Sequence, residues 1–198
     1  MEMGRLTSGS WPRRLALGAA LLAVFGFLVP AASGDDWPTY LHDAARSSTS
    51  GETTLSPQNA SQLQKVWSFT TGGGVAASPT VVGGVVYVGS WDGYEYALNA
   101  SNGTMLWKTY LGVSNPGSQC SPPSAGITSS AAVVSGVVYV GGGDNYWYAL
   151  NASTGAVLWK IDVGNPNSNT YDGHYNWSSP LIYNGYAYIG IAASATAR

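Results

Sequence analysis

The 198-residue chain has few of the side chains on which most enzymes rely. Only 9% of its residues are charged, it contains two histidines and one cysteine, and its formal net charge is −2. It has no HExxH pair and no G-x-S-x-G elbow, so it carries neither of these zinc-protease and serine-hydrolase signatures. A basic stripe is also missing, which argues against a nucleic-acid partner. These absences direct attention to repeats and loops rather than to a catalytic motif.

The first 34 residues have the pattern of an export signal. Three arginines precede residue 15, an apolar run covers 15–29, and small residues occupy 32–34. The apolar run has the length of a signal peptide and is short for a membrane span. We expect a signal peptide over 1–34, cleavage before Asp35, and a secreted or periplasmic chain with no membrane span after cleavage. An uncleaved anchor is the alternative. In such a compartment Cys120 either pairs with a cysteine outside this chain or is a free thiol.

The main feature that is present is an internal repeat. Residues 78–108 and 130–160 align without a gap, and each copy contains four strand-like runs separated by turn residues. In the first copy these runs are 79–82, 85–89, 94–99 and 104–111. Four short strands joined by tight turns predict one antiparallel sheet of roughly 40 residues, the size of a propeller blade. Because a single blade cannot bury its own apolar faces, the copies are expected to stack.

Fragments of two further blades flank these copies. Residues 179–190 match the first two strands of a blade, and residues 64–69 match only the fourth strand, with Leu63 where a turn glycine would stand. We therefore predict an all-β fold, an incomplete β-propeller of four-stranded antiparallel blades. The expected order is a lead-in segment over 35–64 and a partial propeller over 65–198. Its blades cover about 75–112 and 126–164, with a half blade at 177–192. A lone fourth strand at the start suggests closure of the ring by an N-terminal strand.

The run Ala-x-Asn-x-x-x-Gly-x-x-x-Trp occurs once in each copy. It resembles the tryptophan-docking motif of the pyrroloquinoline quinone (PQQ) repeat family, whose usual form has Asp where this chain has Asn99 and Asn151. The opening segment 36–43 is similar to the stretch that precedes the first blade in that family. The structural docking residues that the resemblance implies are Ala97, Gly103, Trp107, Ala149, Gly155 and Trp159. A repeated tryptophan is expected to pack blade against blade rather than to bind a ligand.

The resemblance specifies the fold more narrowly than the function. Propellers of this family usually have seven or eight blades, so we expect this chain to be a truncated product or a fragment. The family includes quinoprotein dehydrogenases, an outer-membrane assembly lipoprotein and sensor domains of kinases, and many members bind no PQQ. Its dehydrogenases hold PQQ beside calcium, often next to a disulfide between adjacent cysteines, and this chain has no Cys-Cys pair. The cofactor is therefore unknown from the sequence, with PQQ and calcium as an option for the complete protein.

Candidate functional residues lie in the loops expected on one face of the propeller, here called the top face. The segment 172–177 is the densest polar and aromatic cluster, and its candidates are Asp172, His174 and Trp177, with Trp177 as a stacking platform. The alternative is a structured loop whose aromatic rings cover the edge of the core. No metal site is expected, because Asp92 and Asp144 are typical turn residues without the several oxygen donors that calcium needs in one loop.

Two functional hypotheses follow. The first is an exported binding or interaction scaffold that carries a protein, small-molecule or glycan ligand on its top-face loops. The second is the N-terminal fragment of a secreted PQQ- and calcium-dependent dehydrogenase acting on an alcohol or a sugar. The resemblance to PQQ-repeat proteins supports both, and a suitable carboxylate together with calcium ligands would favour the enzyme.

Overall fold

The computed structural model describes residues 35–114, 125–163 and 174–193, which all fall within one unit that spans residues 33–198. Cys120, Asp172 and the predicted signal segment lie outside the described residues. Apart from one short 3-10 helix, η1 (Ala60–Gln62), every regular element in the described residues is a β-strand. No helix in this part of the chain is long and apolar enough to cross a membrane. The predicted all-β fold is confirmed.

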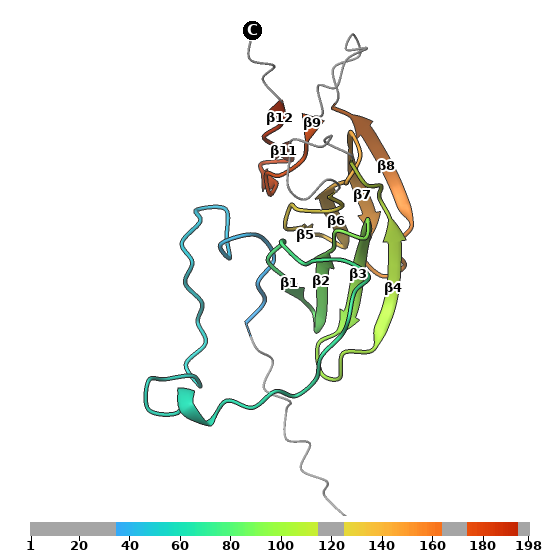
Figure 1. The fold of residues 1–198 in the computed structure, drawn as a ribbon. Helices are drawn as coiled ribbons and strands as arrows, with labels where there is room; N and C mark the ends of the chain where they lie inside the picture. The colour runs from blue at the N-terminus through green and yellow to red at the C-terminus, as the bar shows by residue number, and fades with distance from the viewer. Residues whose placement is uncertain (1–34, 115–124, 164–173, 194–198) are drawn as a thin grey trace, which may run out of the picture. The chain divides into compact units, whose positions relative to one another are not determined.

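Two four-stranded antiparallel sheets form the predicted full blades. The first contains β1 (Thr80–Val82), β2 (Val85–Gly89), β3 (Tyr94–Asn99) and β4 (Met105–Tyr110), paired in that order (Figure 1). The second contains β5 (Ala132–Val134), β6 (Val137–Gly141), β7 (Tyr146–Asn151) and β8 (Val157–Asp162), again paired in order. In both sheets the register shifts at the same place, beside the alanine of the repeated motif. The two copies of the sequence therefore fold into two copies of one sheet.

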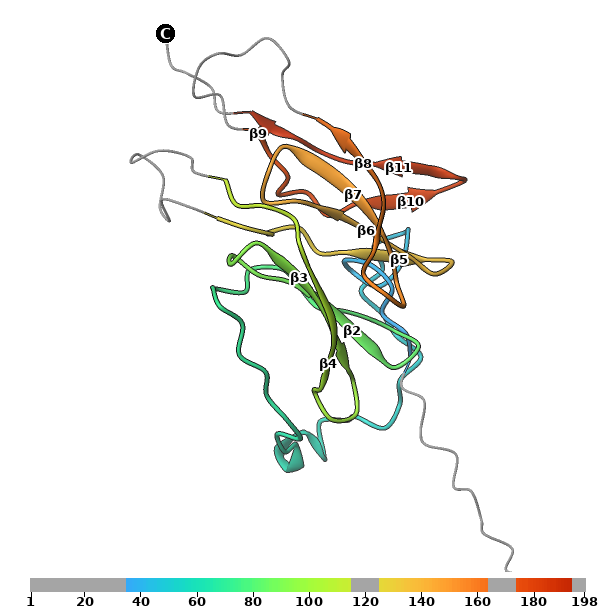
Figure 2. The ribbon, with the colours of Figure 1, turned by 90° about the vertical axis from the view of Figure 1, so that its right-hand side faces the viewer.

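The predicted half blade is also present. The hairpin of β10 (Leu181–Tyr183) and β11 (Tyr186–Tyr188) occupies the positions of the first two strands of a blade (Figure 2). Its turn is Asn184-Gly185, and both residues have positive φ, as a two-residue hairpin turn requires. Two short strands, β9 (His174–Tyr175) and β12 (Ala192–Ala193), pair with each other.

The first blade docks on the second through Trp107. The indole Nε1 donates to the carbonyl of Ala152 at 2.9 Å, and a Cβ on Gly155 would lie only 2.7 Å from the ring. Tyr87 donates its hydroxyl to the same carbonyl, and Thr109 donates to the Gly155 carbonyl. Gly155 has φ +71°, so glycine meets both the backbone conformation and the close approach at this position. The Asn-x-x-x-Gly turn of one blade thus receives the tryptophan of the blade before it.

The expected fourth strand at 64–69 is not formed, so this part of the prediction is wrong. These residues belong to no strand, because no neighbouring strand in the described residues offers them a ladder. The tryptophan in this segment nevertheless docks as its counterpart does. Trp67 Nε1 donates to the carbonyl of Ala100 at 2.8 Å, and a Cβ on Gly103 would lie 2.6 Å from its ring. The match of residues 64–69 to the repeat therefore reflects a tryptophan that docks on a turn of the first blade, and not a strand that pairs with a neighbour.

The lead-in segment lies along the free edges of the first strands of the blades. The backbones of Trp37 and Val81 exchange two hydrogen bonds, at 2.7 and 3.0 Å, which places the segment beside β1. The Val133 amide of β5 donates to the carbonyl of Pro38 at 2.8 Å. Thr39 donates to the carbonyl of Pro180, just before β10. The same short segment therefore contacts all three blades at the edges that carry the candidate site.

Candidate functional site

A groove of about 690 Å³ lies where the lead-in segment meets the starts of β1, β5 and β10. Ser78, Ser130 and Ser179 occur at equivalent places in it, each two residues before the first strand of its blade. We call this the inner-edge groove, and its lining residues are Tyr40, Leu41, Arg46, Ala76, Ser78, Thr128, Ser130, Trp177, Ser178 and Ser179. It combines hydroxyl groups, two aromatic rings and one arginine.

The three serines form a row that links the blades. The Ser78 amide donates to the hydroxyl oxygen of Ser130 at 2.9 Å, and the Ser130 amide donates to that of Ser179 at 3.0 Å. The hydroxyls of Ser130 and Ser179 act as acceptors here, and each retains a hydrogen of its own to donate. Donation of these hydrogens to a further acceptor would leave both contacts between the blades intact.

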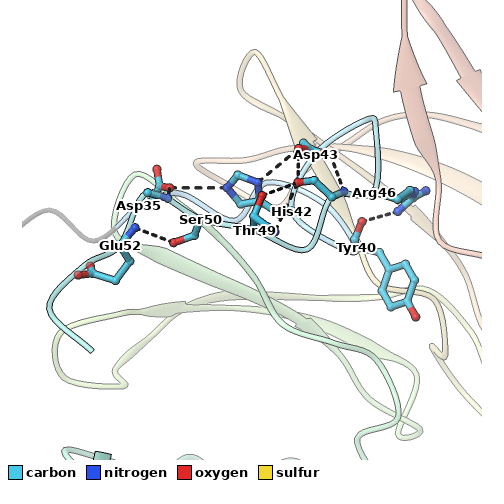
Figure 3. Close-up of polar contacts among 10 residues, drawn as sticks. Asp35, Tyr40, His42, Asp43, Arg46, Thr49, Ser50 and Glu52 are labelled. Atoms are coloured by element: carbon cyan, nitrogen blue, oxygen red, sulfur yellow. Dashed lines mark hydrogen bonds and ion pairs between the residues drawn. The ribbon is translucent and has the colours of Figure 1, made fainter. Parts of the chain in front are cut away.

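Arg46 supplies the only charged side chain among the groove-lining residues. Its guanidinium donates to the backbone carbonyls of Tyr40 and Pro180, and lies 5.5 Å from the centre of the Tyr40 ring. Figure 3 shows the first of these hydrogen bonds. No carboxylate in the described residues forms an ion pair with this guanidinium. The groove therefore has one fixed positive charge and no negative one, and its electrostatics favour acceptor groups and anions.

The structure places the three predicted site residues unequally. Trp177 lines the groove and is 58% exposed. His174 begins β9, where it is in register with Ala193. Asp172 lies outside the described residues. The structure thus brings Trp177 together with Arg46 and the serine row, which the sequence did not single out. The offset of 52 between Ser78 and Ser130 was the signal that could have found the serines.

Asn176 fixes the position of the chain next to Trp177. Its side-chain amide donates to the carbonyls of Gly142, Asp144 and Tyr146 at 3.3, 3.0 and 3.1 Å, and the residue is only 4% exposed. These carbonyls belong to the top-face turn of the second blade. The asparagine of the predicted cluster therefore has a structural role, and it anchors the backbone that carries Trp177.

Asp92 and Asp144 lie in equivalent turns of the two blades. Each accepts a hydrogen bond from a tyrosine hydroxyl four residues later, at 2.6 Å from Tyr96 and 2.8 Å from Tyr148. Burial raises the pKa of Asp92, but hydrogen bonds from Tyr96 and from nearby backbone amides outweigh burial and hold the pKa below its usual value. Within the described ranges, no group of three His, Cys, Asp or Glu side chains is arranged to hold a metal ion. Both aspartates accept hydrogen bonds from residues of the strand that follows their turn.

A second cavity, of about 400 Å³, lies beside His42 in the lead-in segment. The imidazole lies between two carboxylates, 3.7 Å from Asp35 through Nε2 and 3.7 Å from Asp43 through Nδ1 (Figure 3). Its ring also makes an edge contact with Trp37 at 4.8 Å. A hydroxyl and an amide of Ser47 donate to Asp43 and lower the pKa of that carboxyl. These contacts hold the bend of the lead-in segment in place.

Comparisons with known proteins give one family. The family described as outer membrane protein assembly factor BamB matches residues 38–192. The chain is 31% identical to a 1-butanol dehydrogenase (cytochrome c) of Thauera butanivorans, over 92% of this chain and 27% of that protein. It is 34% identical to the assembly factor BamB of Salmonella typhimurium, over 50% of this chain and 26% of that protein.

Among solved structures, a quinohemoprotein alcohol dehydrogenase of Pseudomonas putida is similar to this chain. The TM-score is 0.68 at 27% identity, over 80% of this chain and 23% of that one. The chain therefore spans about a quarter of the length of the relatives that it matches. The match to the dehydrogenase sequence extends over more of this chain than the match to BamB.

Proposed function

The chain belongs to the PQQ-repeat family, and on that premise we propose that it is an exported binding scaffold whose ligand occupies the inner-edge groove. The observation that carries the proposal is the serine row, which places one hydroxyl at the same position in each of three blades. Export is supported by the basic and apolar pattern of residues 1–34.

The chemistry of the groove suits binding. Hydroxyl donors, one arginine and the exposed ring of Trp177 can orient a ligand that has acceptor oxygens and a flat face. A nucleophile with an adjacent base, or a cluster of metal ligands, would favour catalysis instead. The groove-lining residues include no histidine, cysteine or carboxylate.

The proposal is tested by amide NMR of the full chain during titration with panels of saccharides and short peptides. We expect saturable shifts at the amides of Ser78, Ser130 and Trp177 with at least one ligand class. The matched variant is Ser78→Ala, which removes one hydroxyl of the row, keeps the backbone amide that donates to Ser130, and should weaken that binding. Shifts confined to residues outside the groove, or none with either panel, would contradict the proposal.

A second candidate is the N-terminal part of a PQQ-dependent alcohol dehydrogenase. It is favoured by one observation, namely that the match to the 1-butanol dehydrogenase covers 92% of this chain, whereas the match to BamB covers 50%. Arg46 and the serine hydroxyls could bind a carboxylate of such a quinone, whose redox chemistry would then come from the cofactor.

The described residues fit only part of a quinone site. They supply one arginine for a ligand with several carboxylates, and they contain no group of three side chains that could hold calcium. We therefore derive no catalytic step for this chain. Saturable, calcium-dependent binding of PQQ in calorimetry would nevertheless favour the dehydrogenase over the scaffold.

A further inference from the structure

Glu95 is a carboxyl group buried between the two blades without a hydrogen-bond partner. It lies in β3 and is fully buried, and neither of its carboxyl oxygens has a donor among the described residues. The equivalent position in the second blade is Trp147, which is also buried. This position of the repeat is therefore buried in both blades, and in the first blade it is occupied by an ionisable side chain.

The carboxyl packs against the linker that joins the two blades. Glu95 is in register with Gly89 of β2 and Thr109 of β4. A Cβ on Gly89 would clash with the side chain of Ile127 and would lie 3.0 Å from Glu95 Oε2. Glu95 and Ile127 therefore share the space over Gly89. The Thr109 hydroxyl donates to the Gly155 carbonyl, so its hydrogen is already used.

Among the described residues of β2, β4 and the linker, no charged or titratable group compensates Glu95. On β2, Tyr87 donates its hydroxyl to a carbonyl of the second blade. On β4, Lys108 lies over the rings of Tyr94 and Tyr96, which alternate with Glu95 along β3 and so occupy the other face of the sheet. The described linker residues 125–127 contain no ionisable side chain. Burial alone raises the pKa of Glu95, to about 8.

The linker continues from this contact into the inner-edge groove. The Ile127 amide donates to the carbonyl of Ser90 at 3.0 Å, which ties the linker to the first blade. The next residue, Thr128, lines the groove, and so does Ser130 of the serine row. A displacement of Ile127 would therefore move one wall of the groove, because Thr128 and Ser130 in that wall follow Ile127 by one and three residues.

We propose that Glu95 is a pH-sensitive latch for this wall, closed when the carboxyl is neutral and loosened when it is ionised. A carboxylate cannot stay in an apolar site without donors, so ionisation favours states in which Ile127 separates from Ser90 and water reaches the carboxyl. The latch deepens the proposed function by giving the groove a regulator. Only the effect of the latch on ligand binding rests on the proposed function. The loosening of the linker itself is a property of the chain without a ligand.

The latch is tested by hydrogen exchange of the full chain, with the intrinsic rates divided out, at about pH 6 and about pH 9. The reporters are the amide of Ile127 and the amide of Leu111, which donates to the Gly93 carbonyl at 2.7 Å. The reference is the amide of Val163, which makes the matching bond to Asn145 in the second blade. The control variant is Glu95→Gln, which has nearly the same shape and does not ionise. Glu95→Leu is the second variant, since it leaves no polar group unpaired.

We expect protection at Ile127 and Leu111 to fall at least about tenfold from the lower to the higher pH in the native chain. Burial raises the pKa of Glu95 from 4.5 to about 8 in the closed state, so the open state gains a factor of about ten per pH unit between these two values. Protection at Val163 should not change, and neither variant should show the fall. An equal fall in the native chain and in either variant that folds would overturn the latch. So would unchanged protection in the native chain. Because no ligand is present, these outcomes are independent of whether the groove binds anything.

Discussion

Replacing Trp107 by alanine should destabilise the chain much more than the same change at Trp159. The two tryptophans occupy equivalent positions in the repeat, but Trp107 is 8% exposed and Trp159 is 47% exposed. Trp107 also donates to the Ala152 carbonyl. Truncation of a buried tryptophan costs about 3–5 kcal/mol, which includes the cavity that it leaves. The half-exposed Trp159 has about half of that transfer free energy to lose and leaves no closed cavity, so its loss should cost about 1–2 kcal/mol.

The assay is urea unfolding followed by far-UV circular dichroism, since each variant removes a fluorophore. The free energies of unfolding of the two variants should differ by about 2 kcal/mol or more. Trp107→Phe separates ring packing from the hydrogen bond and should cost about 1 kcal/mol beyond the loss of area. Equal destabilisation of the chain by the two alanine variants would refute the reasoning, because docking on the second blade would then contribute nothing.

Two further predictions concern a turn glycine and an acidic turn residue. Gly155→Ala should destabilise the chain more than Gly136→Ala in the same urea assay. Both glycines have positive φ, but only a Cβ at position 155 would contact the ring of Trp107. Equal destabilisation by the two variants would show that the backbone conformation alone matters. The lowered pKa of Asp92 means that its carboxylate contributes stability above the ordinary aspartate value, about 3.8, and that this contribution is lost as the pH falls through the lower folded value. Asp92→Asn should therefore lose less stability than the native chain when acid unfolding is followed between about pH 5 and about pH 2, and parallel curves would contradict this assignment.

The strands could be predicted closely because their signals are local. Alternating β-branched and aromatic residues define β2 and β6, and turn glycines mark both ends. The segment 64–69 shows the limit of that argument. Its tryptophan carries the repeat pattern because it docks on a turn, and a docking pattern does not supply the neighbouring strand that a ladder requires. The repeated tryptophan predicted packing between the repeats, which the docking of Trp67 agrees with, but it did not predict the secondary structure of this segment.

The candidate site could be predicted only in part, because it is built from distant segments. Trp177 was a candidate from its loop alone. Arg46 reaches the groove because the lead-in segment follows the inner edges of the blades and its guanidinium binds the Pro180 carbonyl, 134 residues away. Glu95 would ordinarily be taken for a surface residue. Its alignment with Trp147 was the one sequence signal that this position faces the interior.

The most direct test of the scaffold assignment is a calorimetric titration of PQQ into the chain with calcium present. We predict no saturable binding, since the described residues offer one arginine and no cluster of metal ligands. Tight one-to-one binding that depends on calcium would contradict it, and would assign the groove to quinone chemistry instead.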